Sequence, residues 1–199
     1  MGKLAKKLAR TQNKHNKFRK QALKEERRCM LAKKQTRHLT TKQIVVDMMV
    51  KADAINDVST ILLLAANHVF GFGAKRIKKL NRKMFIHYDC IKDKMVTMRD
   101  IDRILKEEAH LDIQDDREDV AEKYKDFDHY FQITRKVMDE LSSCWLISLL
   151  DGFNYKAKRL AKGYHEAGKI SLALKENRTT SEDLFKELEI IKMRGRKTK

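Results

Sequence analysis

Two stretches of the sequence carry one pattern: residues 70–77 read Phe-Gly-Phe-Gly-Ala-Lys-Arg-Ile, and residues 153–160 read Phe-Asn-Tyr-Lys-Ala-Lys-Arg-Leu. The stretches lie 83 residues apart, and the match continues without a gap on both sides. Downstream, Thr97 aligns with Thr180 at the same offset. Because a match that persists at one offset indicates internal repetition, the sequence predicts two copies of one structural unit.

The composition predicts that both units are helical. The 199 residues include no proline and only seven glycines, and helix-favouring Leu, Lys, Ala, Glu, Met and Arg are abundant. An all-β fold needs many turns rich in glycine and proline, so this class is excluded. Since 42% of the residues are apolar, a buried core is expected, and the predicted fold class is all-α.

Each unit is expected to contain a long helix, a tight corner, a cationic helix and a capped final helix. In the first unit, Thr40 lies three residues before Gln43, which is a capping-box signature, and the helix is expected to end near Phe70. The final helices open with Thr-x-x-Asp at residues 97–100 and 180–183. The predicted parts are a basic arm (1–39), unit 1 (40–110), a linker (111–116), unit 2 (117–191) and a basic tail (192–199).

The net charge of +17 is concentrated at the ends of the sequence. Residues 1–43 carry 15 Lys and Arg against two acids, residues 44–191 carry 25 against 26, and residues 192–199 add five cations. Like charges oppose compaction, so this excess indicates a polyanionic partner. Three interpretations of the arm remain open: a nucleic-acid arm, which we favour, a membrane-surface helix, and a solvated charge run.

The first corner and the helix after it resemble the helix-hairpin-helix nucleic-acid motif, in which a Gly-hydrophobic-Gly turn precedes a helix with basic residues. The resemblance covers residues 70–80 and implies that backbone N–H groups at the helix start bind a phosphate. In the second copy Asn154 and Lys156 replace Gly71 and Gly73, so only the first corner is expected to contact phosphate directly. The alternative is that both corners only reverse the chain between packed helices.

At helical spacing, Ile77, Leu80 and Met84 share one face, and six cations with no acid among them occupy the rest. These cations form two rows, one of Lys75, Lys78 and Arg82 and the other of Arg76, Lys79 and Lys83. We predict nucleic-acid contacts from both rows, from Gly71 and Gly73, from Lys158, Arg159 and Lys162 in the second copy, and from Lys6, Lys7, Arg10, Lys17, Arg19 and Lys20 in the arm.

Residues 63–100, with Phe-Gly-Phe-Gly-x-Lys-Arg followed by Tyr-Asp-Cys-Ile and Val-Thr-Met-Arg-Asp, and with Ile101 directly after them, resemble small uncharacterised proteins of phages and prophages of Gram-positive bacteria. The resemblance implies a phage or mobile-element setting and carries no activity. We therefore expect the protein to act in the cytoplasm of a bacterial host.

The sequence offers no strong sign of catalysis. Three widely spaced cysteines and scattered histidines lack zinc-ligand spacing, and neither a P-loop nor a nucleophile elbow occurs. Asp126, Asp128 and His129 are an isolated trio, so we expect no metal and no cofactor. No apolar stretch reaches the length of a membrane span.

We therefore predict a non-enzymatic protein that binds DNA or RNA. One alternative is a protein-interaction module, such as a phage inhibitor or adaptor of a host nucleoprotein, for example a polymerase or a CRISPR nuclease. Another is a structural role in which the arm lines a packaged genome.

Overall fold

The computed structural model describes residues 41–111, 113 and 128–194. The chain divides into two units, residues 1–48 and 49–199. Residues 41–48, the described part of the first unit, are helical. Within the described residues every regular element is a helix and no strand occurs, so the predicted all-α class is confirmed there.

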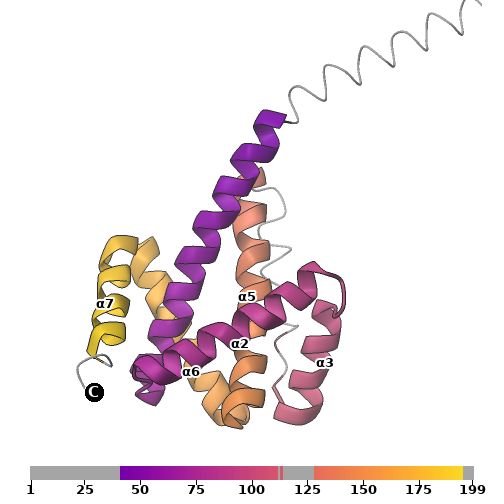
Figure 1. The fold of residues 1–199 in the computed structure, drawn as a ribbon, viewed down its shortest axis with the longest axis vertical. Coiled ribbons are helices and arrows are strands. Elements are labelled where there is room, and N and C mark those ends of the chain that lie inside the picture. Colours follow the sequence, from indigo (N-terminus) through magenta and orange to yellow (C-terminus); the bar gives the residue numbers. More distant parts are fainter. Residues whose placement is uncertain (1–40, 112, 114–127, 195–199) are drawn as a thin grey trace, which may run out of the picture. The chain divides into compact units, whose positions relative to one another are not determined.

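The second unit begins with helical residues 49–70, called here the leading helix, which is drawn in indigo to violet in Figure 1. A three-residue corner separates it from the next helix, and a second such corner follows Phe153. The other described helices are α2 (Ala74–Lys92), α3 (Met98–Ala109), α5 (His129–Phe153), α6 (Ala157–Lys175) and α7 (Ser181–Arg194).

Helix α5 is the centre of the second unit. Every residue from Leu141 to Leu150 is buried, which is the pattern of a helix surrounded by neighbours on all sides. Helices α2, α3 and α6 all pack on α5, and α2 also contacts α7. Buried serines in this stretch form hydrogen bonds: Ser148 donates to the carbonyl of Cys144, and Ser143 donates to Asp102 of α3.

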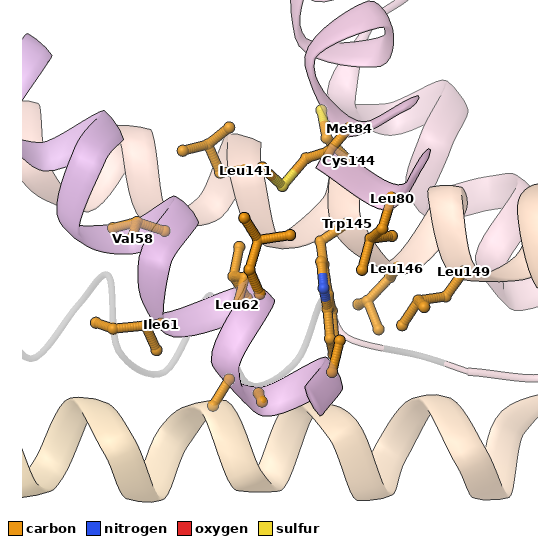
Figure 2. Close-up of a cluster of buried hydrophobic side chains, with 14 of the residues drawn as sticks. Val58, Ile61, Leu62, Leu80, Met84, Leu141, Cys144, Trp145, Leu146 and Leu149 are labelled. Atoms are coloured by element: carbon orange, nitrogen blue, oxygen red, sulfur yellow. The ribbon is translucent and has the colours of Figure 1, made fainter. Parts of the chain in front are cut away.

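Trp145 is the largest side chain of the core and is fully buried. Figure 2 shows it in one cluster with Leu62 of the leading helix, Leu80 of α2 and Leu149 of α5. Helix α6 reaches the same cluster, because a Cβ added at Gly163 would lie 2.7 Å from the Trp145 ring. The indole therefore joins the leading helix, α2, α5 and α6 in a common core.

The apolar face that the sequence predicted for the first cationic helix is confirmed. Ile77, Leu80 and Met84 of α2 are all buried, and Tyr88 extends the face by one further turn. Burial of such a stripe supplies most of the driving force for packing, since apolar area removed from water contributes about 25 cal/mol per Å².

The predicted caps of the final helices are confirmed as well. The backbone N–H of Asp100 donates to the Thr97 hydroxyl at 3.2 Å, and the Thr97 N–H donates back to the Asp100 carboxylate at 3.0 Å. At α7 the N–H of Asp183 donates to the Thr180 hydroxyl at 3.2 Å. Hydrogen bonds from the threonine hydroxyls hold the pKa of both aspartates below the usual range.

Several predicted parts lie outside the described residues: the basic arm, most of the linker, and residues 195–199 of the basic tail. Helix α7 continues to Arg194, past residue 191, where the sequence placed the end of the second unit. In the part of the chain that the structure describes, no helix combines the length and the apolar character needed to cross a bilayer.

Candidate nucleic-acid interface

The first corner contains one residue in the left-handed conformation and is held by two hydrogen bonds to Asn67. Gly71 has φ +62° and its N–H donates to the carbonyl of Asn67 at 2.8 Å, while the Asn67 amide donates to the carbonyl of Phe72 at 2.9 Å. The positive φ explains the glycine at position 71. Gly73 precedes α2 in extended backbone, and a Cβ added there would meet no atom within 4 Å. The approach to the start of α2 is therefore open.

The second corner makes the same turn without glycine. Asn154 has φ +53° and its N–H donates to the carbonyl of Leu150 at 2.9 Å, so the expectation that asparagine supports the turn is confirmed. Lys156, at the position of Gly73, directs its ammonium to the carbonyl of Glu108 at 3.3 Å. It thereby contacts the last turn of α3, where exposed carbonyls favour a cation.

The aromatic residues of the two corners form a single cluster. The rings of Phe70 and Tyr155 are 4.8 Å apart between centroids, and those of Phe72 and Phe153 are 4.6 Å apart. Phe72 and Tyr155 also contact each other at 6.1 Å. The two corners, 83 residues apart in sequence, therefore lie side by side, and so do the starts of α2 and α6.

The starts of α2 and α6 differ from those of α3 and α7. Neither α2 nor α6 has a hydrogen bond from a capping side chain, and neither has an acid in its first turn. By contrast, α3 and α7 carry an aspartate there. Unsatisfied N–H groups and the helix dipole give α2 and α6 positive ends that their own side chains do not neutralise.

The structure separates the two cation rows of α2. Lys75, Lys78 and Arg82, called here the free row, are exposed and have no hydrogen-bond or ion-pair partner among the described residues. They lie opposite the buried face of Ile77 and Met84. The free row is therefore available to an external anion.

The other row contacts the corners and the end of α5. The guanidinium of Arg76 lies 5.7 Å from the Phe72 ring centroid. The ammonium of Lys79 donates to the carbonyl of Gly152 at 3.1 Å and lies 5.0 Å from the Phe153 ring centroid. Lys83 forms an ion pair with Asp151. These three cations, which we predicted to bind nucleic acid, already have partners inside the protein.

Two titratable groups respond to this arrangement. The hydrogen bond from Lys83 holds the pKa of the Asp151 carboxyl below its usual range. Burial lowers the pKa of the neighbouring His87, against the opposing field of Asp151. Lys79 and Lys83 place two cations at the last turn of α5, where a helix C-terminus favours positive charge.

The predicted cations of α6 divide in the same way. Lys158 and Lys162 are exposed without partners among the described residues, whereas the Arg159 guanidinium lies 4.9 Å from the Tyr155 ring centroid. Arg159 therefore makes the same cation–π contact with Tyr155 that Arg76 makes with Phe72. The six predicted arm residues, Lys6, Lys7, Arg10, Lys17, Arg19 and Lys20, lie outside the described part of the chain.

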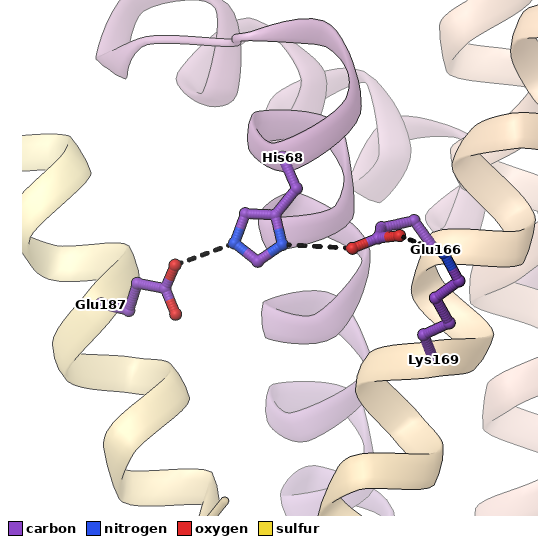
Figure 3. Close-up of polar contacts among 4 residues, drawn as sticks. All are labelled: His68, Glu166, Lys169 and Glu187. Carbon is purple, nitrogen blue, oxygen red and sulfur yellow. Dashed lines mark hydrogen bonds and ion pairs between the residues drawn. The ribbon is translucent and has the colours of Figure 1, made fainter.

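A polar network that the sequence did not suggest links three helices. His68 of the leading helix lies between two carboxylates, with Nε2 2.8 Å from Glu187 of α7 and Nδ1 3.5 Å from Glu166 of α6 (Figure 3). Lys169 joins Glu166 at 3.3 Å. No signal in the sequence indicated this network, because its residues come from three helices, and the leading helix is far from the other two in the chain.

No cluster of three His, Cys, Asp or Glu side chains suited to a metal occurs among the described residues. Of the trio Asp126, Asp128 and His129, the first lies outside them. Cys90 is half-buried and Cys144 is buried, and both are free thiols.

No protein-family model matches the chain, and no curated protein or solved structure is significantly similar to it.

Proposed function

We propose that the protein is a non-enzymatic nucleic-acid-binding protein that neutralises phosphates with the free row of α2, with Lys158 and Lys162 of α6, and with the basic arm. The observation that carries the proposal is the free row: Lys75, Lys78 and Arg82 are exposed and unpaired beside an uncapped helix start. Phosphate contacts position a protein on nucleic acid without reading sequence, so weak sequence preference is expected. The resemblance to small proteins of Gram-positive phages supports a role in the cytoplasm of a phage-infected or prophage-carrying bacterium.

We further propose that residues 40–110 and 117–191 are two copies of one helical unit. Three observations support this. Helices α2 and α6 both have 19 residues and start 83 residues apart, at Ala74 and Ala157. Left-handed residues recur at Gly71 and Asn154, and again at Lys94 and Asn177. The threonine caps recur at the same offset.

In this proposal the second helix of each copy packs on the first helix of the other copy. Lys83 of α2 pairs with Asp151 of α5, and Glu166 of α6 pairs with His68 of the leading helix. At the offset of 83, His68 corresponds to Asp151 and Lys83 corresponds to Glu166. The basic and the acidic partner therefore exchange positions between the two pairs. Pairing within one copy would place the carboxylates of Asp151 and Glu166 beside each other, which their like charges disfavour, and would leave Lys83 beside His68 without an acidic partner.

The test is fluorescence anisotropy with a labelled duplex DNA and a labelled RNA across a salt series. The variant replaces Lys75, Lys78 and Arg82 by Gln. If each contacts one phosphate of the duplex, the log–log salt slope becomes shallower by roughly 2.7, at about 0.9 per contact.

The matched control replaces Lys136, Lys169 and Lys186 by Gln, which removes the same charge from exposed lysines that already have acidic partners. This control is expected to change the slope much less. Equal effects of the two triple variants would mean that only net charge matters and would contradict a defined site. Unchanged affinity after deletion of residues 1–39 would exclude the arm.

A further inference from the structure

An open groove lies between the leading helix, α5 and α6. Its volume is about 190 Å³, and its walls include Val58 and Ile61 of the leading helix, Met138 of α5, and Ala167 and Gly168 of α6. Most of the lining is apolar. The polar groups in the walls come from Ser142, Tyr164 and Ser171.

The duplication proposed above provides an internal reference for this groove. At an offset of 83, Ala167, Gly168 and Ser171 of α6 correspond to Met84, Phe85 and Tyr88 of α2. In the α2–α5 interface Met84 and Tyr88 are fully buried and Phe85 packs against the core. The groove is therefore open where three large side chains of the equivalent interface are replaced by small ones.

The helices that line the groove also carry exposed apolar side chains and two unpaired lysines within two turns of the lining residues. Met138 is 42% exposed, and Leu172, one helical turn after Gly168, is 48% exposed. Lys175 lies one turn after Ser171 on the same face of α6, and Lys51 lies two turns before Val58 on the leading helix. Neither lysine has an ion-pair partner among the described residues. Two unpaired lysines on the helices that flank an apolar groove favour an acidic ligand with an apolar face.

We propose that this groove binds an acidic amphipathic helix of a partner protein, which inserts one or two Phe, Leu or Met side chains where α2 supplies Met84 and Phe85 in the equivalent interface. The inserted side chains fill apolar volume that the fold leaves open. Lys51 and Lys175 pair with acids beside the inserted residues. Recognition of this kind is helix-in-groove binding, with anchors at helical spacing.

The test uses a labelled amphipathic peptide of about five helical turns, with Phe and Leu at every third or fourth position and Glu elsewhere. A second peptide has Lys in place of Glu, and a third has the same composition in scrambled order. Binding is measured by fluorescence anisotropy to the full chain and to the variant Ala167→Met with Gly168→Phe, which restores the side chains of the equivalent interface. The matched control, Ala52→Met with Asn56→Phe, adds the same groups at exposed positions of the leading helix.

The acidic peptide is expected to bind the native protein saturably and to bind the control variant equally well. Its affinity for the filled variant, Ala167→Met with Gly168→Phe, should be at least about tenfold lower. Changing Lys51 and Lys175 to Glu should reverse the preference between the acidic and the lysine peptide. Should the filled variant fail to fold, as judged by circular dichroism, Met138→Ala with Leu172→Ala removes the apolar rim and should weaken binding severalfold.

Three results would overturn the proposal: no saturable binding of the acidic peptide, equal binding to the filled variant, or equal binding of the scrambled peptide. A native dimer that the filled variant converts to a monomer in sedimentation experiments would assign the groove to a second copy instead. The filled variant should retain the duplex affinity of the native protein, so this test and the test of nucleic-acid binding fail independently.

Discussion

The interface between α2 and α5 differs from the interface between α6 and the leading helix in packing and in charge. The first is filled by Met84 and Tyr88 and is joined by the Lys83–Asp151 ion pair. The second is open along Ala167 and Gly168 and is joined through His68 and Glu166. If the two interfaces descend from one, the smaller side chains of α6 have left the second interface open where the first is filled.

The same substitution placed in each interface provides the sharpest comparison. Met84→Ala removes a fully buried side chain, so the free energy of unfolding should fall by about 2–5 kcal/mol. Met138→Ala at the rim of the groove should lower it by less than about 1 kcal/mol, because that side chain is already 42% exposed. Urea unfolding of both variants measures the difference. Equal losses would show that the groove is closed in solution.

Substitutions of two glycines of α6 test where the helix changes from close packing against its neighbours to the open groove. A Cβ at Gly163 would lie 2.7 Å from the Trp145 ring and 2.9 Å from the Phe70 ring, whereas a Cβ at Gly168 would meet no atom within 4 Å. Gly163→Ala should destabilise the protein by about 1–3 kcal/mol through overpacking. Gly168→Ala should stabilise it by up to about 1 kcal/mol, because alanine favours helix over glycine.

Thermal unfolding followed by circular dichroism reports both glycine variants with the same probe. Shifts of the same sign would contradict the packing described for Trp145. A destabilising Gly168→Ala would mean that the groove wall at α6 is closer to its neighbours than the structure has it.

The surface ion pair of the filled interface should make a small contribution that depends on pH. Because Lys83 holds the pKa of Asp151 below its unfolded value, the pair stabilises the fold above the unfolded pKa, and this contribution is lost as the pH falls through the lowered folded pKa. Asp151 is more than half exposed, so Asp151→Asn should cost less than about 1 kcal/mol at neutral pH. Urea unfolding at neutral and acidic pH should find the two proteins converging in acid. A constant difference would point to packing instead.

The elements that local pattern determines could be predicted from the sequence. The apolar spacing of Ile77, Leu80 and Met84 gave the buried face of α2, and Thr97 with Asp100 gave the start of α3. Asparagine tolerates the left-handed conformation, and this property predicted the turn at Asn154. Each of these depends on residues within one or two helical turns, where propensity and periodicity are strong guides.

The division of the cations could not be predicted in the same way. Lys79 and Lys83 have partners because the end of α5, about 70 residues later in sequence, lies beside them. Helical periodicity placed them correctly on one row of α2 but carried no information about which helix that row would meet. The groove could not be predicted from the sequence either. The small residues of α6 indicate a groove only when they are compared with Met84, Phe85 and Tyr88 in the packed structure.

Substitution of Tyr88 has the smallest expected effect on stability and tests whether water is excluded from the interface between α2 and α5. Its hydroxyl is buried with no hydrogen-bond partner among the described residues, and burial raises the pKa of the phenol to about 12. An unpaired buried hydroxyl costs free energy that phenylalanine avoids at nearly the same volume. Tyr88→Phe should therefore leave stability unchanged or raise it by about 1 kcal/mol, as measured by urea unfolding. A loss of more than that amount would mean that a water molecule or a neighbouring group, such as Glu140, satisfies the hydroxyl in solution, and the filled interface would then be less dry than its packing indicates.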